Sequence, residues 1–568
     1  MTPTAIQTIL HALTLSLVTG TPLLLAALCC TPLQKAAARF LPCAAIPAFL
    51  AIFTTPINVV VEVPWFFMGS RMGLDETGRI FLCLTSFIWF LASFSSRNLL
   101  RKDKGKTHYL VFFLTAMAGN FGLILARDML GYYLFFAVMS FAAYGLVIHK
   151  RTADAVKAGR IYLTLVMIGE VALFTALIIL AHNSGSLALE DIAGVSHHPL
   201  TLILLFIGFG VKIGALPLHG WMMPAYQSAP IPAATVLAGA MVNAGILGWL
   251  RFLPLGQTSS SQGAVLFVVA GALAALYGVI IGLNRKKAGA ILGCSSISQM
   301  GLMTVIFGLG LLDYNAGISA APILILYVVH HSLAKSTLFF GYELIERQSK
   351  PVSHLQMAAI LLPALALAGL PFTSGAIAKT AFKELAVNLG EPWYGLSVFF
   401  LPITAMGTTM LMLHFISILR HSKSTGTSKN AEHSVIFPIS LIATLTIIWL
   451  WPAARHSASH SLAATTLLQA LWPVIGGCLL FLSWQRISFN KKVPVGVQEK
   501  QTGFEALLIT ATKLMQEKKW QKPQSGRLHS YRHRLIPHLR RTEKIMGRWK
   551  VVGLSYLALC LYLLFLLL

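Results

Sequence analysis

Residues 206–221, FIGFGVKIGALPLHGW, place Lys212 inside an otherwise apolar run, five residues before Pro217. A charged side chain at the bilayer centre costs about 2.5–3.5 kcal/mol on insertion scales, so such residues usually face a partner or a water-filled cavity. Proline frees a backbone carbonyl, which inside a membrane must be satisfied by protein or by water. The stretch therefore predicts a broken membrane helix that carries Lys212 toward a hydrated interior.

The composition of the whole chain is that of a polytopic membrane protein. Of 568 residues, 56% are hydrophobic and only 11% are charged, although the formal net charge is +25. Soluble domains are about 45–50% apolar, a disordered chain would be polar, and a basic nucleic-acid binder would spread its charge over a soluble surface. Here the charge lies between long apolar runs, which excludes disorder and nucleic-acid binding.

A spanning helix needs about 20 mostly apolar residues. We predict an all-α fold with about 16 transmembrane helices. They lie near residues 9–30, 41–60, 79–97, 108–127, 129–149, 160–182, 199–216, 232–253, 263–283, 288–312, 318–346, 355–385, 393–419, 435–452, 463–485 and 551–568.

Lysine and arginine gather in the loops after odd-numbered predicted helices, as at Lys102, Lys150 and Arg285, whereas loops 183–198 and 313–317 hold almost none. The positive-inside rule then predicts a multi-pass protein of the cell inner (plasma) membrane with both termini outside the cytoplasm.

A basic segment, residues 486–550, is predicted to be cytoplasmic by the same rule, and its residues 503–520 have the pattern of an amphipathic helix lying on the membrane. Such a helix is either an anchor on anionic lipid or a strut that grips a partner subunit.

Further titratable side chains lie in apolar runs: Glu170 in VMIGEVALFTAL, His331 and Lys335 in ILYVVHHSLAKSTLFF, and Lys379 in LPFTSGAIAKTAFKEL. Residues i and i+4 share a helix face, so His331 stacks with Lys335, and Lys379 with Lys383. Aligned groups of this kind can pass a proton along, directly or through water. The predicted proton-relay residues are Glu170, Lys212, His331, Lys335 and Lys379.

Polar neighbours of these residues are predicted to be secondary members of the relay. They are His219, Asn243, Ser296, Ser298, Gln299 and Lys383. The run GCSSISQMG at 293–301 could hold water, but ordinary hydrogen bonding between helices is the alternative. Lys383 has the alternative of snorkelling to the interface, and His330 is expected to be structural.

The chain is predicted to carry no catalytic residue, no metal and no cofactor. Its seven cysteines form no CxxC pair, which argues against iron–sulfur and zinc sites. No Gly-rich phosphate loop is present. Any driving reaction must therefore come from partner subunits.

Several segments resemble a known family. KIGALPLHGWMMPAYQSAPIPAATVLAGAMVNAGILGWLRF (212–252), SSISQMG (295–301), HSLAKSTLFF (331–340) and GAIAKTAFKE (375–384) resemble the antiporter-like subunits of respiratory complex I, Mrp-type cation/proton antiporters and membrane-bound hydrogenases. The same family includes the membrane partner of an inorganic-carbon uptake system. GLDETGRIF (73–81) resembles a further family segment.

The resemblance implies two inverted five-helix repeats with one broken helix in each. Lys212 takes the place of the central lysine of the first half, Lys335 that of the bridging lysine, and Lys379 that of the terminal lysine or glutamate. The predicted organisation is 1–106 N-terminal helices, 107–253 first repeat, 254–420 second repeat, 421–485 C-terminal helices, 486–550 basic cytoplasmic segment and 551–568 final transmembrane helix.

Two positions depart from the family pattern. Members usually carry a glutamate in the fifth helix, where this chain has Ala137, and a histidine or lysine in the eighth, where it offers only Asn243. Glu170 falls where some members carry an aspartate, and we infer that it is the sole carboxylate partner of Lys212.

The preferred hypothesis is a proton-translocating membrane subunit of a multisubunit complex, with other subunits, protons and the lipid bilayer as partners. One alternative is a Na⁺/H⁺ antiporter subunit, which would add Na⁺. Another is the membrane partner of a proton-driven inorganic-carbon uptake system. The last is a degenerate scaffold that conducts nothing, which Ala137 and the missing eighth-helix base favour.

Overall fold

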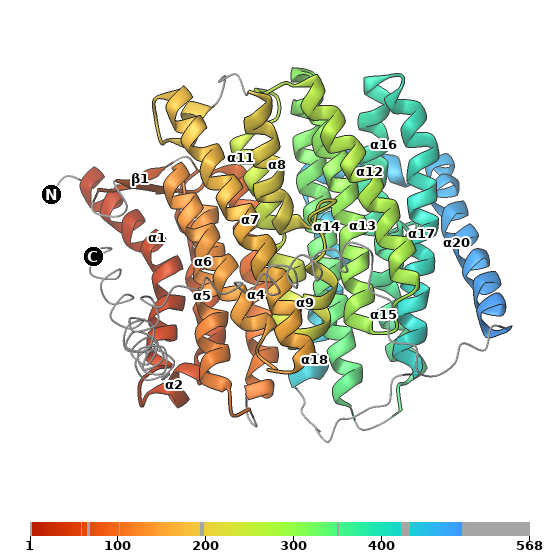
Figure 1. Cartoon of the computed structure of the whole chain (residues 1–568), viewed down its shortest axis with the longest axis horizontal. Coiled ribbons are helices and arrows are strands. Elements are labelled where there is room, and N and C mark those ends of the chain that lie inside the picture. Colours follow the sequence, from red (N-terminus) through yellow and green to blue (C-terminus); the bar gives the residue numbers. More distant parts are fainter. Residues whose placement is uncertain are drawn as a thin grey trace, which may run out of the picture.

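The computed structural model describes residues 3–57, 59–64, 69–100, 103–192, 198–348, 351–421 and 432–490. The predicted amphipathic helix at 503–520 and the predicted last span at 551–568 lie outside these residues. Within them the chain is almost entirely helical, and long helices stand side by side in one layered body (Figure 1).

The helices follow one another across the molecule in approximate chain order (Figure 1). They are α1 (Pro3–Leu28), α2 (Gln34–Arg39), η1 (Leu41–Ala45), α3 (Ile46–Thr54), α4 (Glu76–Leu100), α5 (Lys106–Leu125), α6 (Met129–Val147), α7 (Ala153–Ser184), η2 (Leu189–Ile192), α8 (Pro199–Ile213), α9 (Met222–Ser228), α10 (Ile231–Val236), η3 (Leu237–Met241), α11 (Asn243–Phe252), α12 (Ser261–Leu283), α13 (Ala288–Gly310), α14 (Tyr314–Arg347), α15 (His354–Ala368), α16 (Ser374–Leu389), α17 (Trp393–His421), α18 (Glu432–Leu450), η4 (Pro452–Ala454), α19 (Arg455–Ser461) and α20 (Ala464–Asn490).

The described residues contain 11 helices that are long and apolar enough to cross a membrane, or up to 12 if one bent pair is a single span. Three further apolar helices, Leu41–Thr54, Pro199–Ile213 and His354–Ala368, are shorter than a full span. The all-α membrane fold is therefore confirmed, whereas the total of 16 helices stays a prediction.

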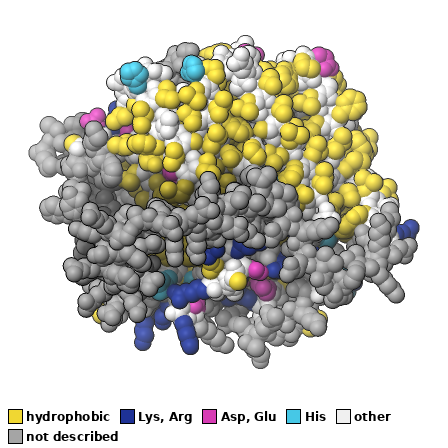
Figure 2. Space-filling view, in the orientation of Figure 1, with side chains coloured by type: hydrophobic (Ala, Val, Ile, Leu, Met, Phe, Trp, Pro, Cys, Tyr) yellow, Lys and Arg dark blue, Asp and Glu magenta, His cyan; other side chains and the backbone are white. Residues whose placement is uncertain are grey.

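Hydrophobic side chains distinguish the lipid-facing surface from the interior. Only half of the most apolar stretch of α7 is buried. Large apolar residues such as Val171, Leu273 and Ile280 are exposed on α7 and α12. Figure 2 shows a broad hydrophobic band over this face, with Lys and Arg gathered below it. In contrast, all of α13 and all of the segment Ile231–Phe252 except Ile231 and Leu250 are buried, so they form the centre of the molecule.

Two spans are broken where the sequence predicts. Helix α8 ends at Gly214, with φ +70°, and α15 ends at Gly369, with φ +93°. Glycine adopts this left-handed conformation without a Cβ clash, and it commonly ends helices. After each break the chain resumes as a second helix, α9 or α16.

A third irregularity was not predicted. Leu237–Met241 (η3) forms a π-helical turn between α10 and α11. A Cβ on Gly239 would lie 2.1 Å from the Ser336 hydroxyl of α14. Glycine at this position therefore lets η3 pack directly on the helix that carries Lys335.

One end of the bundle is tied together by an ion-pair network. Strands β1 (Val60–Val63) and β2 (Ser70–Gly73) form an antiparallel hairpin just before α4. Asp75 accepts a hydrogen bond from the Gly78 N–H in the first turn of α4. Its two oxygens lie 3.2 Å from Arg127 and 3.2 Å from Arg251. The segment GLDETGRIF thus joins α4 to elements far along the chain.

The same network sets the pKa of Asp75. Burial alone raises the pKa of this carboxyl, but Arg251, Arg127 and the Gly78 N–H together hold it below its ordinary value. The carboxylate is therefore the stable form at neutral pH.

Candidate functional site

Titratable groups form a series that crosses the bundle, and all of them except the partly buried Lys379 are buried. Glu170 comes from α7, Lys212 from α8, His331 and Lys335 from α14, and Lys379 from α16. These helices succeed one another from left to right in Figure 1. Glu170 is 5% exposed, Lys212 3% and Lys335 0%. None of these three side chains snorkels to the surface.

Lys212 is held by hydroxyl groups. Its Nζ donates to the Ser140 hydroxyl of α6 at 3.3 Å and approaches the Tyr162 hydroxyl of α7 at 3.5 Å. Nζ also lies 5.8 Å from the centre of the Phe136 ring, within range of a cation–π interaction. Sequence reasoning missed Ser140 and Tyr162, because only the packing of three helices brings them together.

Glu170 lies close to Lys212 but makes no ion pair with it within 4 Å. The carboxylate interacts electrostatically with Lys212 and lies near Ser140. Neither of its oxygens has a hydrogen-bond partner among the described residues. Buried polar atoms in native proteins are usually satisfied by protein or water, so this carboxylate is a place where water is expected.

Small residues explain why α7 and α8 approach so closely at this point. A Cβ on Gly169 would lie 3.1 Å from the Val211 side chain, and a Cβ on Gly208 would lie 2.8 Å from Leu173. Gly169 precedes Glu170 and Val211 precedes Lys212. Close helix contact thus sets the carboxylate beside the ammonium group.

Ala137, where the resemblance leads us to expect a glutamate, adjoins this group. Ala137 lies one helical turn before Ser140 on α6, and residues at i and i+3 share a face. The Ser140 hydroxyl contacts Lys212 from that helix. The group on α6 that contacts Lys212 is therefore a neutral hydroxyl.

His219 and Asn243 follow the first broken helix. The His219 ring packs edge-on against Tyr277 of α12, with centroids 4.6 Å apart. Asn243 donates to the Gly239 carbonyl at 2.8 Å and to the Ser332 hydroxyl of α14 at 2.7 Å. Asn243 thus connects the predicted first repeat to the residue beside His331.

The polar run of α13 divides into two sets. Ser298 donates to the Ala275 carbonyl of α12 at 2.8 Å, and Gln299 bonds to Thr408 and Tyr327, so both join helices. The hydroxyls of Ser295 and Ser296 have no hydrogen-bond partner among the described residues. Only the second set is free to bind water.

In α14 the two predicted relay residues have different environments. Lys335 Nζ donates to the Leu292 carbonyl of α13 at 2.8 Å. Neither ring nitrogen of the fully buried His331 has a hydrogen-bond partner among the described residues. His330 bonds through Nδ1 to the Ser374 hydroxyl at 2.8 Å, at the start of α16.

Lys379 lies at the second break. Its Nζ donates to the Ala368 carbonyl at 2.6 Å, where α15 ends. Cations are favoured at helix C-termini, because the last carbonyls lack intrahelical partners. The side chain also lines a cavity of about 320 Å³, which Lys383 shares.

Lys383 lies nearer the protein surface than the relay residues on α7, α8 and α14. Its Nζ donates to Gln469 of α20 at 2.6 Å, in an exposed setting. It also lines a larger cavity of about 610 Å³ that shares Thr380, Thr466 and Gln469 with the first. The two cavities are therefore neighbours, with Lys383 in the lining of both.

Two polar clusters were not singled out from the sequence. Glu343, near the end of α14, pairs with Arg347 at 2.8 Å and accepts a hydrogen bond from Ser95. Glu384, His456 and His460 place potential metal-ligand atoms within 4.8 Å of one another. The spacing of His456 and His460 is a usable sequence signal, but the approach of Glu384 is not.

The fold and these contacts define a polytopic membrane protein with a series of buried or partly buried titratable side chains beside two helix breaks. Residues 126–407 match the family model described as NADH:quinone oxidoreductase/Mrp antiporter, transmembrane. The matched region is just under half of the chain, and over it the chain is similar to this family of antiporter-like membrane subunits.

Relatives include hydrogenase-4 component B of Escherichia coli (strain K12), 24% identical over 70% of this chain and 65% of that protein. Another is the putative antiporter subunit mnhA2 of Staphylococcus epidermidis, 27% identical over 65% of this chain and 50% of that protein. The chain thus spans about half to two thirds of the length of these relatives.

Solved structures support the fold. The Mrp complex from Dietzia sp. DQ12-45-1b contains a chain that matches with a TM-score of 0.72 and 19% identity, over 95% of this chain and 63% of that one. The archaeal membrane-bound sulfane sulfur reductase contains one with a TM-score of 0.66 and 16% identity, over 84% of this chain and 99% of that one.

Proposed function

We propose that the chain is a proton-translocating membrane subunit of a multisubunit complex. The observation that carries the proposal is the series of titratable groups on four different helices, buried on α7, α8 and α14 and partly buried at Lys379 on α16. Hydroxyls and ring nitrogens among them lack protein partners within the described residues. Burying these groups in lipid-embedded helices is costly, and such residues commonly mark ion pathways.

The first step of the proposed relay is at Lys212. An opposite charge nearby favours the ammonium form, and a low-dielectric surrounding disfavours it. Glu170 supplies the charge without a direct ion pair, and Ser140 contacts the ammonium. A small separation of α7 and α8 would then favour release of the proton from Lys212.

The next members are Lys335, His331 and Lys379. Water bound at the Ser295 and Ser296 hydroxyls would link the first half to Lys335, since both hydroxyls are buried and without a partner among the described residues. His331, one turn before Lys335, can accept and donate a proton through its two ring nitrogens. Lys379 then delivers the proton to the cavity that leads outward.

The proposed frame has two inverted repeats, residues 107–253 and 254–420. One broken span in each supports it: α8 with α9, and α15 with α16. Helix breaks at matching places in two halves are typical of transporter ion sites.

The proposed orientation puts both termini outside the cytoplasm of a plasma-membrane protein. The basic side chains gathered on one side of the hydrophobic band support this orientation (Figure 2). The Lys379 cavity then opens away from the cytoplasm, since Arg455–Ser461 follows an even-numbered predicted helix.

Partner subunits would supply the driving reaction. Relatives are named as a hydrogenase component and as antiporter subunits, and the two structural neighbours come from membrane complexes. The test uses membrane vesicles that contain the native complex, with proton uptake followed by a pH-sensitive dye. Lys212→Ala is expected to slow uptake at least tenfold, whereas Lys157→Ala, which removes an exposed lysine of α7, leaves it unchanged. Equal uptake by both variants would contradict the relay.

A second candidate is a Na⁺/H⁺ antiporter subunit, which the names of the antiporter relatives favour. Replacing Na⁺ by choline separates the two functions. An antiporter subunit would lose proton flux in choline, whereas a proton-translocating subunit would keep it.

A further inference from the structure

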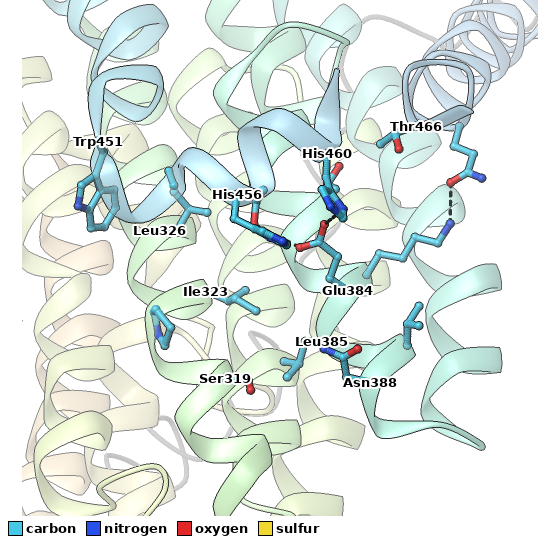
Figure 3. A pocket seen from close by; sticks show the side chains of 17 residues that line it. Ser319, Ile323, Leu326, Glu384, Leu385, Asn388, Trp451, His456, His460 and Thr466 are labelled. Atoms are coloured by element: carbon cyan, nitrogen blue, oxygen red, sulfur yellow. Dashed lines mark hydrogen bonds and ion pairs between the residues drawn. The ribbon is translucent and has the colours of Figure 1, made fainter. Parts of the chain in front are cut away.

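A group of three side chains lies outside the proposed relay, at the surface end of the larger cavity. Glu384 comes from α16, and His456 and His460 come from the short helix α19. Figure 3 shows the two imidazole rings and the carboxylate directed toward one another across the pocket. Both histidines are exposed, so the group is open to solvent.

The helix spacing aligns the two histidines. His460 follows His456 by four positions, which places the two side chains one above the other on a helix face. Their ring centroids are 4.5 Å apart. Paired imidazoles at this spacing are a common way for one helix to offer two metal ligands.

The carboxylate is already oriented toward the histidines. Glu384 Oε1 lies 2.9 Å from His460 Nδ1, and its other oxygen accepts a hydrogen bond from Ser457 at 3.3 Å. A hydrogen bond from a neighbouring side chain, such as the one from Ser457, commonly fixes the orientation of a carboxylate that binds a metal. Helix α19 thus supplies two ligands and the group that holds the third.

The distances suit a small divalent ion. The three ligand atoms lie within 4.8 Å of one another. A tetrahedral zinc ion with bonds of about 2.0–2.1 Å needs ligand atoms about 3.4 Å apart. The widest pair would close by up to about 1.4 Å, and the Glu384–His460 pair at 2.9 Å would widen by about 0.5 Å, to complete the site. Two imidazoles and one carboxylate are a common zinc set, with water in the fourth position.

The nearest lysine does not occupy this site. Lys383 precedes Glu384, but its ammonium donates to Gln469 of α20. The Lys383 ammonium therefore contacts α20 rather than Glu384 or the two histidines.

We propose that Glu384, His456 and His460 bind one Zn²⁺ ion, and that the bound ion obstructs the cavity leading to Lys379. The obstruction follows from the position of the group, since all three residues line the cavity that joins the Lys379 cavity at Lys383. The binding site stands independently, whereas the obstruction rests on the proposed function.

Binding is tested on the full chain purified in detergent. Titration with ZnCl₂ in a calorimeter is expected to show one site per chain, and Co²⁺ is expected to give the visible absorption of a tetrahedral complex. His456→Ala, His460→Ala and Glu384→Gln should each weaken Zn²⁺ binding at least tenfold. His182→Ala, which removes an exposed histidine of α7, should leave binding unchanged.

Absence of Zn²⁺ binding to the wild-type chain would mean that Glu384 and His460 form an ion pair only, and would overturn the site. Equal binding by His182→Ala and His456→Ala would overturn it as well. Gel filtration of each variant excludes misfolding as the cause of a loss.

Transport is measured separately, in vesicles containing the native complex. Zn²⁺ should slow wild-type proton uptake and have at least tenfold less effect on the His460→Ala complex. Zn²⁺ binding without slower uptake would overturn the obstruction. Zn²⁺ binding to a complex that moves no protons would contradict the proposed function and leave the metal site standing.

Discussion

At the scale of single residues, the main feature is a lysine that is buried without a direct ion pair. Lys212 contacts the hydroxyls of Ser140 and Tyr162, and Glu170 lies nearby with both oxygens unpartnered among the described residues. An ammonium held this way is stabilised less than one in a full ion pair, because a buried pair gains strength only from excellent geometry. Such a group can change its protonation state with small movements of its surroundings.

Glu170→Gln tests the role of the carboxylate. The amide keeps the shape but removes the charge that favours the ammonium form of Lys212. Proton uptake in vesicles should fall about tenfold, which corresponds to about 1.4 kcal/mol. Asp191→Asn, which neutralises an exposed acid after α7, is the control and should have no effect.

A second substitution makes this result specific. Ala137 lies one turn from Ser140, so Ala137→Glu in the Glu170→Gln chain would return a carboxylate to the same neighbourhood. Partial recovery of uptake is expected. An undiminished rate in Glu170→Gln alone would show that Lys212 does not depend on this charge.

At the scale of elements, glycine positions decide which helices touch. Gly169 and Gly208 permit the close approach of α7 and α8, and Gly239 lets η3 rest against α14. In each case a Cβ would meet a neighbouring helix at or within 3.1 Å. The buried charges lie next to these contacts, so packing and the proposed transport share the same residues.

Gly239→Ala tests this dependence. The new methyl would require the Ser336 hydroxyl to rotate away, and it would lie 3.2 Å from both the Ser332 carbonyl and the Ile88 side chain, so η3 and α14 must separate by a few tenths of an ångström. Overpacking of this kind costs about 1–3 kcal/mol. Thermal unfolding in detergent should show a lower midpoint.

The matched control is Gly210→Ala in α8, where the nearest atom to a Cβ lies at 3.4 Å, an ordinary contact. This change should be neutral or slightly stabilising, because alanine favours helices more than glycine does. Equal midpoints for the two variants would contradict the packing argument.

The sequence predicted the broken elements because their causes are local. Gly214 with Pro217, and Gly369 with Pro371, interrupt apolar runs in the chain itself. The π-helical turn at Leu237–Met241 could not be predicted in this way, since it depends on the contact of Gly239 with α14.

For the candidate site, too, the sequence predicted the local features and missed those that depend on contacts between helices. A titratable residue in an apolar run is visible in any sequence, which identified Glu170, Lys212 and Lys335 as buried groups and Lys379 as a partly buried one. Their neighbours were not visible: Ser140 is 72 residues from Lys212, and Ser298 turned out to bind α12. The group around Glu384 was missed because α19 meets α16 only in the folded chain.

At the scale of the whole molecule, charges at one end hold distant parts together. Asp75 precedes α4, Arg127 precedes α6, and Arg251 lies near the end of α11. Arg251 also donates to the carbonyls of Leu123 and Ala126, at 2.9 and 2.7 Å. The network therefore joins the end of α11 to the segments that precede α4 and α6.

Asp75→Asn tests this network. Hydrogen bonds to charged groups are worth about 1.5–3 kcal/mol, so the midpoint of thermal unfolding at pH 7 should fall. Because the pKa of Asp75 is below its ordinary value, its stabilisation is complete above a pH of about 3.9 and is lost as the pH falls through the lowered pKa. The difference between wild type and variant should therefore narrow in acid. A constant difference at every pH would assign the effect to shape rather than charge.

The central claim is a continuous proton path between the two halves of the molecule. Every proton that crosses from Lys212 to Lys379 on this path must pass Lys335. The most direct measurement is proton uptake by vesicles that contain the native complex with Lys335→Ala, beside the exposed-lysine control Lys157→Ala. The account predicts uptake at least tenfold slower than wild type for Lys335→Ala and unchanged for the control. Wild-type uptake by an assembled Lys335→Ala complex would contradict it.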